Sequence, residues 1–389
     1  MADIDMAQQR VYVIQFTTVH TRNDTRIRLK EVTTLADRLD ARVSLFVQDG
    51  LGDEEVGEGL FDIRDTGARP GGRLKRMTLG AWRMYRAVRA ARPQVAHFHD
   101  PELIPVGLAL KLSGIKLVYD VHEDLPRQIM GKPYIKPFMR RLVSTAAALA
   151  ERAADRCFDG ILPATPAIAE HFKSRHVALV QNFPILGELM AAAEEPLTNR
   201  PANFAFVGGI TEIRGISEMI DAIAQVDHPE ARLDLVGTFS PQKLRDAMTA
   251  SPGWERVIEH GWADRPTVAA LLGQVRAGLV LYLPSPNHIA AQPNKLFEYM
   301  SAGLPVIASD FPLWRKIVEG AGCGLLVNPE DPQAIAQAMD WMLRNPAEAE
   351  AMGQRGRAAV QSTYNWSKEA ETLVAFYCDE LGVPLKQIH

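Results

Sequence analysis

A short stretch near residue 295 combines a cationic side chain, a carboxylate and the start of a helix. Pro293 opens the stretch Pro-Asn-Lys-Leu-Phe-Glu-Tyr-Met-Ser-Ala-Gly and Gly303 closes it, which is the pattern of a short helix. Its N-terminus would present free amides that suit a phosphate, and Lys295 would add a full charge. Glu298 could accept two hydrogen bonds from a diol such as a ribose. A surface Lys–Glu contact of small energy would give the same pattern, so both interpretations stay open.

A second stretch places two glycines directly after the apolar run Phe-Ala-Phe-Val at 204–207. Gly208 and Gly209 would let a ligand approach the backbone closely, and the Arg214 guanidinium could bind two phosphate oxygens. The pattern is neither GxGxxG nor a Walker loop, and a Gly-Gly pair after a strand is often only a turn. Alone, this stretch is a weak indication of phosphate binding.

Histidines and carboxylates follow two apolar runs in the first half of the chain. One run ends in His99, next to Asp100 and Glu102, and another ends just before His122. Such groups could form a metal site, but no DxD donor-metal loop accompanies them, and we expect no metal. As a purely structural residue, His122 would cap the junction of a strand and a loop.

These residues lie at the ends of short apolar runs that alternate with helical patterns at 26–39, 74–91 and 136–154. Apolar strands separated by helices predict parallel sheets that are covered on both faces. The runs interpreted as strands are 10–16, 42–47, 95–99, 116–121, 160–162, 177–181, 204–207, 233–236, 257–259, 278–283 and 305–308.

The alternation of strands and helices restarts once, after the polar and proline-bounded segment 188–201, which we interpret as a linker. We therefore expect an α/β protein of two Rossmann-like, doubly wound domains, at 1–187 and 202–365, facing a central cleft. Residues 366–389 would form a C-terminal helix that crosses back to the first domain.

Composition narrows the classes of protein to consider. The 389 residues carry a formal net charge of −4, which argues against general nucleic-acid binding. Three cysteines far apart in sequence give no disulfide framework and no zinc signature, as is typical of a reducing compartment. The N-terminal residues lack the basic and apolar regions of a signal peptide, and no apolar run predicts a membrane span. We expect a cytoplasmic protein that could lie on the inner face of the plasma membrane.

Together, the stretches around Gly208 and Lys295 resemble the C-terminal domain of retaining GT-B glycosyltransferases, specifically glycosyltransferase family 4. The resemblance extends through essentially the whole chain and is strongest over 204–328. In that family the turn after the first strand of this domain, with a basic residue beyond it, holds the donor diphosphate. Here these groups would be Gly208, Gly209 and Arg214. An arginine commonly follows the first glycine; Gly209 stands in its place, and Lys295 would compensate.

The resemblance also implies how the rest of the donor is bound. The second Glu of the family's Glu-x7-Glu motif matches Glu298, which would bind the ribose hydroxyls, whereas the first falls on Ala290. The donor sugar would therefore be oriented by other groups of the preceding loop. The donor-binding candidates in that loop are His288, Ala290, Ala291 and Gln292.

In the first half, Val-Tyr-Asp-Val-His-Glu-Asp is similar to the family segment whose histidine reaches the donor sugar, here His122. His99 and Asp100 would lie on the acceptor side. Family members with Asp-Thr-Arg after the first strand use that loop near the acceptor, which implies the same for Asp24 and Arg26. Equally, these two residues could only cap the helix that starts there.

The implied activity is transfer of a hexose-type sugar, with retention of configuration, from a UDP- or GDP-sugar to a glycan or lipid-linked acceptor in surface polysaccharide biosynthesis. His122, Arg214 and Lys295 would be catalytic, and neither a metal nor another cofactor would be needed. A nucleotide-sugar epimerase on the same fold and a non-catalytic sugar-binding protein are the alternatives.

Two basic stretches bear on where the protein works. Residues 73–92 include seven basic side chains and no acidic one, and a second basic and aromatic stretch lies at 132–141. Such stretches suit an anionic membrane surface, although a core-packed helix with a solvated basic side gives the same pattern. The apolar residues that repeat at helical spacing in the first stretch are Met77, Ala81, Met84, Tyr85 and Val88.

Overall fold

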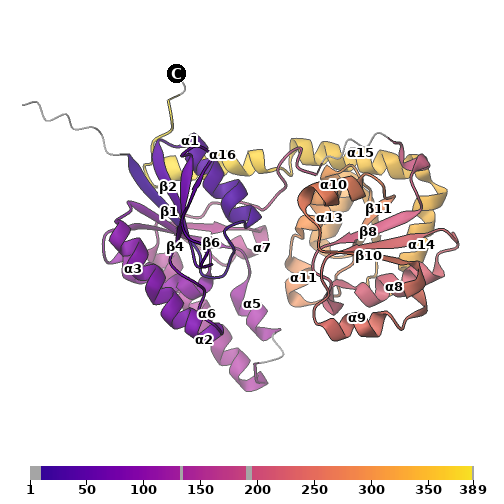
Figure 1. Cartoon of the computed structure of the whole chain (residues 1–389), viewed down its shortest axis with the longest axis horizontal. Helices are drawn as coiled ribbons and strands as arrows, with labels where there is room; N and C mark the ends of the chain where they lie inside the picture. Colours follow the sequence, from indigo (N-terminus) through magenta and orange to yellow (C-terminus); the bar gives the residue numbers. More distant parts are fainter. Residues whose placement is uncertain (1–9, 132–134, 190–194, 388–389) are drawn as a thin grey trace, which may run out of the picture. The chain divides into compact units, whose positions relative to one another are not determined.

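The computed structural model describes residues 10–131, 135–189 and 195–387 (Figure 1). The chain divides into two compact units: unit 1 is Met1–Asn182 with Lys368–His389, and unit 2 is Phe183–Ser367. Each unit contains one predominantly or wholly parallel sheet covered by helices. This arrangement confirms the predicted class of two doubly wound, Rossmann-like α/β domains.

The sheet of unit 1 has the order β3-β4-β2-β1-β5-β6-β7, and all neighbours are parallel except the β3–β4 pair at one edge. The buried strands β1, β5 and β6 lie at its centre, and their carboxyl ends lie on one edge of the sheet. Residues 177–181 were predicted as a strand but form only an isolated bridge, between Val177 and Ile161. The strands are β1 (Val11–Phe16), β2 (Ala41–Val47), β3 (Glu54–Val56), β4 (Phe61–Asp65), β5 (Val95–Phe98), β6 (Lys116–Val121) and β7 (Gly160–Pro163).

The helices of unit 1 include two wide, π-type segments, η1 and η2, each of which continues into a regular α-helix. The helix predicted at 26–39 is therefore divided between η1 and α1, and the one predicted at 74–91 between α2, η2 and α3. The helices are η1 (Thr25–Val32), α1 (Thr33–Arg38), α2 (Arg73–Lys75), η2 (Arg76–Gly80), α3 (Ala81–Ala91), η3 (Pro101–Leu103), α4 (Ile104–Lys111), α5 (Leu125–Met130), α6 (Pro137–Cys157) and α7 (Pro166–Ala169).

The sheet of unit 2 has the order β10-β9-β8-β11-β12-β13, with every neighbour parallel. Its strands are β8 (Asn203–Val207), β9 (Arg232–Val236), β10 (Val257–Gly261), β11 (Ala277–Val280), β12 (Val306–Ser309) and β13 (Gly324–Val327). Its helices are η4 (Leu197–Asn199), η5 (Glu212–Arg214), α8 (Ile216–Gln225), α9 (Gln242–Met248), η6 (Pro252–Arg256), α10 (Arg265–Leu272), α11 (Pro286–Ala290), α12 (Asn294–Ser301), α13 (Pro312–Ala321), α14 (Pro332–Arg344) and α15 (Pro346–Ser362).

The segment 188–201, predicted as a linker, contributes to the packing of unit 2 where it is described. Leu189 and Leu197 are buried in the core of that unit, and residues 190–194 lie outside the described residues. The division between the units falls earlier, after Asn182.

The last helix, α16 (Trp366–Asp379), belongs to unit 1 from Lys368 onward. The hydroxyl of Tyr377 lies 2.9 Å from Nδ1 of His97, on β5. Beyond the helix, the Leu381 carbonyl accepts a hydrogen bond of 2.7 Å from Lys116. The C-terminal segment thus packs against the same strands that position the histidines of unit 1.

Candidate functional site

In unit 2 the turn after β8 lies against two cationic side chains. Gly208 has φ +125°, and a Cβ added there would meet Nζ of Lys295 at 2.5 Å. The Gly209 carbonyl accepts a hydrogen bond of 2.7 Å from Nη1 of Arg214. Both glycines were expected to allow close approach to the backbone. The groups that approach it are the two cations that were predicted to bind phosphate.

Lys295 lies in the first turn of α12, and its amino group packs over the rings of Phe206 and Tyr282. Burial of the amino group, together with the charge of Arg214, lowers the pKa of Lys295 to about 8. Among the described residues, neither Lys295 nor Arg214 forms a salt bridge with a carboxylate. Two cations without carboxylate partners at a helix start and a glycine turn form a site suited to a phosphate.

Tyr282, which sequence reasoning missed, lies at the centre of this cluster. Arg214 is over its ring at 5.6 Å, and the rings of His288 and Trp314 lie 4.9 and 5.5 Å away. In the sequence Tyr282 only ends the apolar run 278–283, so it is indistinguishable from a core aromatic. In the structure Tyr282 is buried in the core of unit 2, and its ring also lies against Arg214 and Lys295.

The loop that was expected to orient the donor sugar is held by hydrogen bonds to its backbone. Nδ1 of His288 lies 3.0 Å from the Leu283 carbonyl, so the neutral ring donates there and leaves Nε2 as an acceptor. Trp314 Nε1 donates to the Ala291 carbonyl at 2.7 Å. Ala290 is the last residue of α11. Gln292, which precedes Pro293 in the chain, is half-buried. Only His288 therefore offers a polar side-chain atom with its hydrogen-bonding role already fixed.

Glu298 is held by an arginine that sequence reasoning missed. Its Oε1 accepts a hydrogen bond of 2.8 Å from Arg265, whose Nε binds Glu188 at 2.7 Å. Its other oxygen has no hydrogen-bond partner in the described part of the chain, and no salt bridge joins Glu298 to Lys295. The surface Lys–Glu contact considered above is therefore not formed, and the carboxylate keeps one oxygen for a diol.

In unit 1, three residues expected on the acceptor side are buried and engaged within the protein. The Arg26 guanidinium binds both oxygens of Asp120, at 2.9 and 2.7 Å. Asp100 accepts hydrogen bonds from Thr17 and Thr18. His99 lies between Asp120 and Gln15, at 3.0 and 3.1 Å. These contacts occupy polar atoms of all three side chains within unit 1, although Nη1 of Arg26 has no hydrogen-bond partner among the described residues, and contact of Arg26, His99 and Asp100 with an acceptor stays a prediction.

Asp24 performs the capping role that the sequence left open. Its Oδ1 accepts from the amides of Arg26 and Ile27 at the start of η1, and its Oδ2 lies 2.9 Å from Nδ1 of His20. Burial alone would raise its pKa, but these hydrogen bonds hold the pKa of Asp24 below its usual value. The side chain is one-quarter exposed, so the cap accounts for its position without an acceptor.

His122, like the neighbouring His20, keeps a solvent-facing part. It follows β6, and its side chain is 17% exposed, whereas His97 and His99 are buried completely. Its Nε2 lies 2.5 Å from Oδ2 of Asp120, and the rings of His20 and His99 lie 5.2 and 5.5 Å away. The predicted sugar contact would therefore come from a ring that is anchored at one nitrogen.

The two halves of the chain match two glycosyltransferase family models. Residues 28–181 match the family described as "Glycosyl transferase 4-like domain", and residues 201–345 match "Glycosyl transferases group 1". The chain belongs to the GT-B glycosyltransferases. In this GT-B protein the second match contains the Gly208 turn, Arg214, Lys295 and Glu298, and the first contains His122.

Individual relatives of this GT-B protein are distant. The D-rhamnosyltransferase WbpZ of Pseudomonas aeruginosa is 29% identical over 167 residues, which are 42% of this chain and 42% of that protein. The match therefore spans less than half the length of that relative. Sucrose-phosphate synthase from Thermosynechococcus elongatus is similar in structure, with a TM-score of 0.77 at 19% identity over 96% of this chain and 100% of that one. HepE of Anabaena in complex with UDP-glucose is also similar in structure. Its TM-score is 0.69 at 13% identity, over 94% of this chain and 98% of that one. These structural likenesses show the shared fold.

Proposed function

We propose that this protein transfers a hexose-type sugar from a nucleoside-diphosphate sugar to a glycan or lipid-linked acceptor, with retention of anomeric configuration. The observation that carries the proposal is the pair of cations without carboxylate partners, Arg214 and Lys295, beside Gly208 and Gly209. A nucleoside diphosphate gains negative charge as it leaves the sugar. Preorganised cations and helix-terminal amides stabilise that charge more in the transition state than in the ground state.

The remaining donor groups have partners of matching chemistry in unit 2. The free oxygen of Glu298 would accept hydrogen bonds from the ribose hydroxyls, while Arg265 holds the other oxygen. The loop with His288 and Ala291 would orient the sugar, and His122 of unit 1 would contact the transferred sugar. HepE of Anabaena, whose fold is similar, has been crystallised with UDP-glucose, which supports a nucleotide-sugar donor here. We assign the removal of the acceptor proton to the leaving phosphate, and no protein base is required.

The acceptor proposal rests on a relative and on the surface of unit 1. WbpZ is named as a D-rhamnosyltransferase, which supports transfer of a hexose-type sugar, and we propose that the acceptor belongs to a surface polysaccharide. In the described part of the chain, none of the helices is long and apolar enough to cross a membrane. If the acceptor is lipid-linked, we propose that the enzyme reaches it by docking unit 1 on an anionic membrane.

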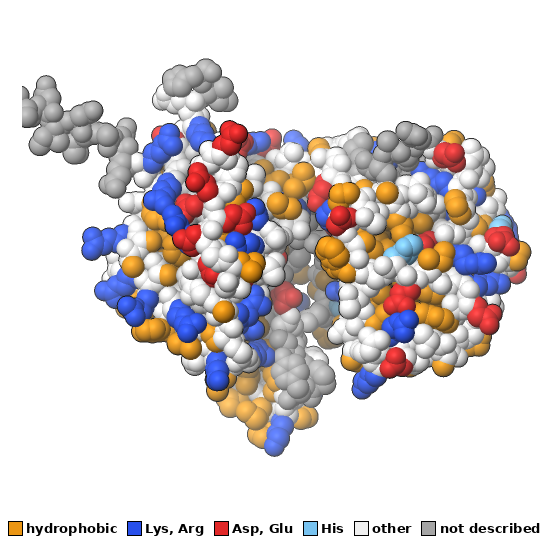
Figure 2. All heavy atoms as spheres, viewed as in Figure 1, with side chains coloured by type: hydrophobic (Ala, Val, Ile, Leu, Met, Phe, Trp, Pro, Cys, Tyr) orange, Lys and Arg blue, Asp and Glu red, His pale blue; other side chains and the backbone are white. Residues whose placement is uncertain are grey.

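The exposed side chains of unit 1 support such docking. Phe138 and Leu142 of α6 and Leu74 of α2 are 75%, 70% and 76% exposed, close in sequence to exposed Lys75 and Arg141. Figure 2 shows apolar and basic side chains gathered at the lower tip of unit 1 as drawn. By contrast, the apolar stripe predicted on α3 packs into the core through Ala81, Met84 and Val88, and residues 132–134 of the second basic stretch lie outside the described residues. The docking surface therefore centres on α2 and the start of α6.

The decisive experiment is a transfer assay preceded by a thermal-shift screen of UDP, GDP, ADP and their hexose conjugates, since a ligand of the folded state raises its Tm. We expect one nucleotide class to bind and its sugar to be transferred only when an acceptor is added. The anomeric configuration of the product, read by NMR, tests retention. Epimerised donor without an acceptor would favour the epimerase, and binding without turnover would favour a sugar-binding protein.

Metal independence is tested in the same assay. We expect transfer to continue in excess EDTA, because Arg214 and Lys295 supply the positive charge that a divalent ion would otherwise provide. Complete loss of transfer in EDTA, restored by Mg²⁺ or Mn²⁺, would contradict the proposed stabilisation of the diphosphate.

A further inference from the structure

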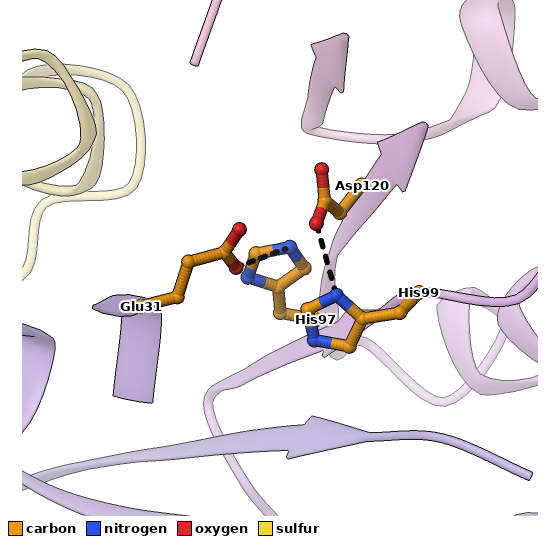
Figure 3. Close-up of side chains that lie close together, drawn as sticks. All are labelled: Glu31, His97, His99 and Asp120. Carbon is orange, nitrogen blue, oxygen red and sulfur yellow. Dashed lines mark hydrogen bonds and ion pairs between the residues drawn. The ribbon is translucent and has the colours of Figure 1, made fainter. Parts of the chain in front are cut away.

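A buried cluster of ionisable groups contacts His122 in unit 1. Figure 3 shows Glu31, His97, His99 and Asp120 converging from η1, β5, the residue after β5, and β6. One ligand-type atom from each lies within 4.8 Å of all the others, and every one of these side chains is buried. Burying a charge without a partner costs free energy, so the way in which these groups pair with one another indicates their role.

The cluster already contains its own cation. Nε and Nη2 of Arg26 bind the two oxygens of Asp120, and Nε also lies 3.0 Å from Oε1 of Glu31. A divalent ion on the same oxygens would be placed against a buried guanidinium, which charge repulsion disfavours. The guanidinium therefore binds both oxygens of Asp120 by hydrogen bonds, whereas the oxygens of Glu31 have no hydrogen-bond partner among the described residues and only Oε1 lies beside the cation.

The two carboxyl groups differ in charge. Burial alone would raise the pKa of Asp120, but the charge of Arg26 and the hydrogen bonds from His122 and His99 hold it well below its usual value. Burial and the adjacent charge of Asp120 raise the pKa of Glu31 well above its usual value. Asp120 is thus the anion of the pair, fixed in place by Arg26.

This anion is the group that binds His122. Oδ2 of Asp120 is 2.5 Å from Nε2 of His122, and an ionised carboxylate can only accept, so Nε2 carries the proton. Nδ1 of His122 has no hydrogen-bond partner within the described ranges of the chain. A neutral ring held in this way leaves Nδ1 free to accept a hydrogen bond from a hydroxyl group.

We propose that Asp120 is a positioning residue for sugar transfer that acts through His122. It fixes the Nε2–H tautomer and the orientation of the ring, so that Nδ1 accepts a hydrogen bond from a hydroxyl of the transferred sugar. Arg26 and Glu31 support it by holding its charge and its position. This inference rests on the proposed function, in which His122 contacts that sugar. In general, a buried aspartate that is hydrogen-bonded to an imidazole fixes the tautomer and the orientation of that ring.

The first test reads the tautomer in the full-length protein and needs neither donor nor turnover. The chain is labelled with ¹⁵N-histidine, and the His122 signals are assigned by their loss in His122→Gln. In the neutral ring we expect the proton on Nε2. In Asp120→Asn this preference should weaken or reverse, whereas Asp124→Asn, a helix-cap variant two residues beyond His122, should leave it unchanged.

The second test asks whether Asp120 acts through His122 in transfer. We expect Asp120→Asn and His122→Gln each to lower kcat about a hundredfold, the scale for loss of one oriented polar group. In the His122→Gln background, Asp120→Asn should cost less than about threefold more, because the two substitutions then break one interaction. A purely structural Asp120 would give multiplicative losses instead.

The outcomes separate this inference from the proposed function. An Nδ1–H tautomer in the wild-type protein overturns the role of Asp120 whether or not Asp120→Asn folds. Unchanged transfer in His122→Gln, with the expected tautomer, overturns the sugar contact but not the hydrogen bond. One equivalent of a transition metal that is retained through purification and lost in Asp120→Asn would show a metal centre and would also overturn the inference.

Discussion

If Lys295 binds the donor diphosphate, as we propose, the affinity for the donor should depend on pH. Its pKa of about 8 in the free protein means that the amino group loses its proton as the pH rises through that value. A diphosphate attracts the charged form, so nucleotide binding should weaken above pH 8 and should be accompanied by proton uptake there. We expect the dissociation constant of the nucleoside diphosphate to rise about tenfold between pH 7 and 9, measured by calorimetry in buffers of different ionisation enthalpy.

Lys295→Arg provides the control, because guanidinium keeps its charge throughout this range. The variant should bind with little pH dependence even if its affinity is lower. An equal pH dependence in both proteins would assign the titration to the ligand or to another group.

Glu298 and Glu188 form a matched pair for testing the ribose contact. Both carboxylates bind Arg265, but Glu298 belongs to the helix that carries Lys295. Glu298→Gln should weaken donor binding by about 1.5–3 kcal/mol, the scale for a hydrogen bond to a charged group. Glu188→Gln removes a similar charge from Arg265 and should change donor affinity much less. Equal effects on calorimetric affinity would mean that the carboxylates only support Arg265.

Residue types at strand ends could be predicted from the sequence, but their bonding could not. The sequence places Arg26, His99 and Asp100 beside apolar strands, where a ligand could reach them. Whether such groups face a ligand or one another depends on distances across the sheet that no local pattern contains. Arg26 and Asp120 are 94 residues apart in the chain and 2.7 Å apart in the fold.

Tyr282 and Arg265 were missed because a local sequence pattern does not show which distant residues they contact. Tyr282 reads as the end of a buried strand, and Arg265 reads as an ordinary charge at the start of a helix. By contrast, Gly208, Arg214, Lys295 and Glu298 were predicted as donor-binding residues because the stretches around Gly208 and Lys295 resemble the C-terminal domain of the glycosyltransferase family. They do lie around one turn and one helix start.

At the scale of elements, the sequence predicts the strands of continuous apolar residues well and some polar or short strands poorly. Most central strands are continuous apolar runs, whereas β3 and β4 contain acidic residues, Glu-Glu-Val and Phe-Asp-Ile-Arg-Asp, and were not predicted. The edge strand β13 was also missed, because Gly324–Val327 is short and lies between two helices. Run 177–181 is apolar but pairs at a single position, so composition alone overestimated it.

The N-terminus of η1 gives a prediction about stability. Asp24→Ala removes a cap that accepts two backbone hydrogen bonds and should lower the free energy of unfolding by about 0.5–2 kcal/mol. Asp24→Asn keeps a capping oxygen and should cost less, as measured by urea denaturation. If Asp24 instead served the acceptor, both variants would raise the acceptor KM and leave the unfolding curves unchanged.

The cost of Asp24→Asn should depend on pH. Burial alone would lower the pKa of His20, but the Asp24 carboxylate raises it. A raised histidine pKa contributes stability below the unfolded value, and that stability is lost as the pH rises through the folded value. The difference in unfolding free energy between wild type and Asp24→Asn should therefore be larger at pH 5.5 than at pH 8.

At the scale of the whole molecule, the sequence showed two α/β domains but misplaced the segment between them. Polarity and prolines suggested a linker at 188–201, yet Leu189 and Leu197 anchor its described parts in the core of unit 2, and Glu188 holds Arg265 there. A segment of high average polarity can still pack in a core through a few buried leucines. The sequence likewise does not show which apolar residues remain exposed on the surface, and only the fold does.

Exposed apolar residues therefore give the sharpest test of membrane docking. Transfer of Phe138 or Leu142 from water into a lipid interface is worth up to about 1.5–3 kcal/mol each, and each basic residue nearby adds about 1 kcal/mol. Phe138→Ser with Leu142→Ser should abolish co-sedimentation with vesicles of anionic lipid at low salt but spare nucleotide binding by unit 2. The control is Leu112→Ser, which removes a leucine of unit 1 that is 92% exposed but lies at the end of α4. The charge-reversal variant, in which Arg83, Arg86 and Arg89 are replaced by Glu, should bind these vesicles less than the wild type. The deficit should grow as the salt concentration falls, because the repulsion between the new carboxylates and the anionic lipid is then less screened. Wild-type protein that stays in the supernatant at low salt would mean that the acceptor is soluble and that these side chains serve another contact.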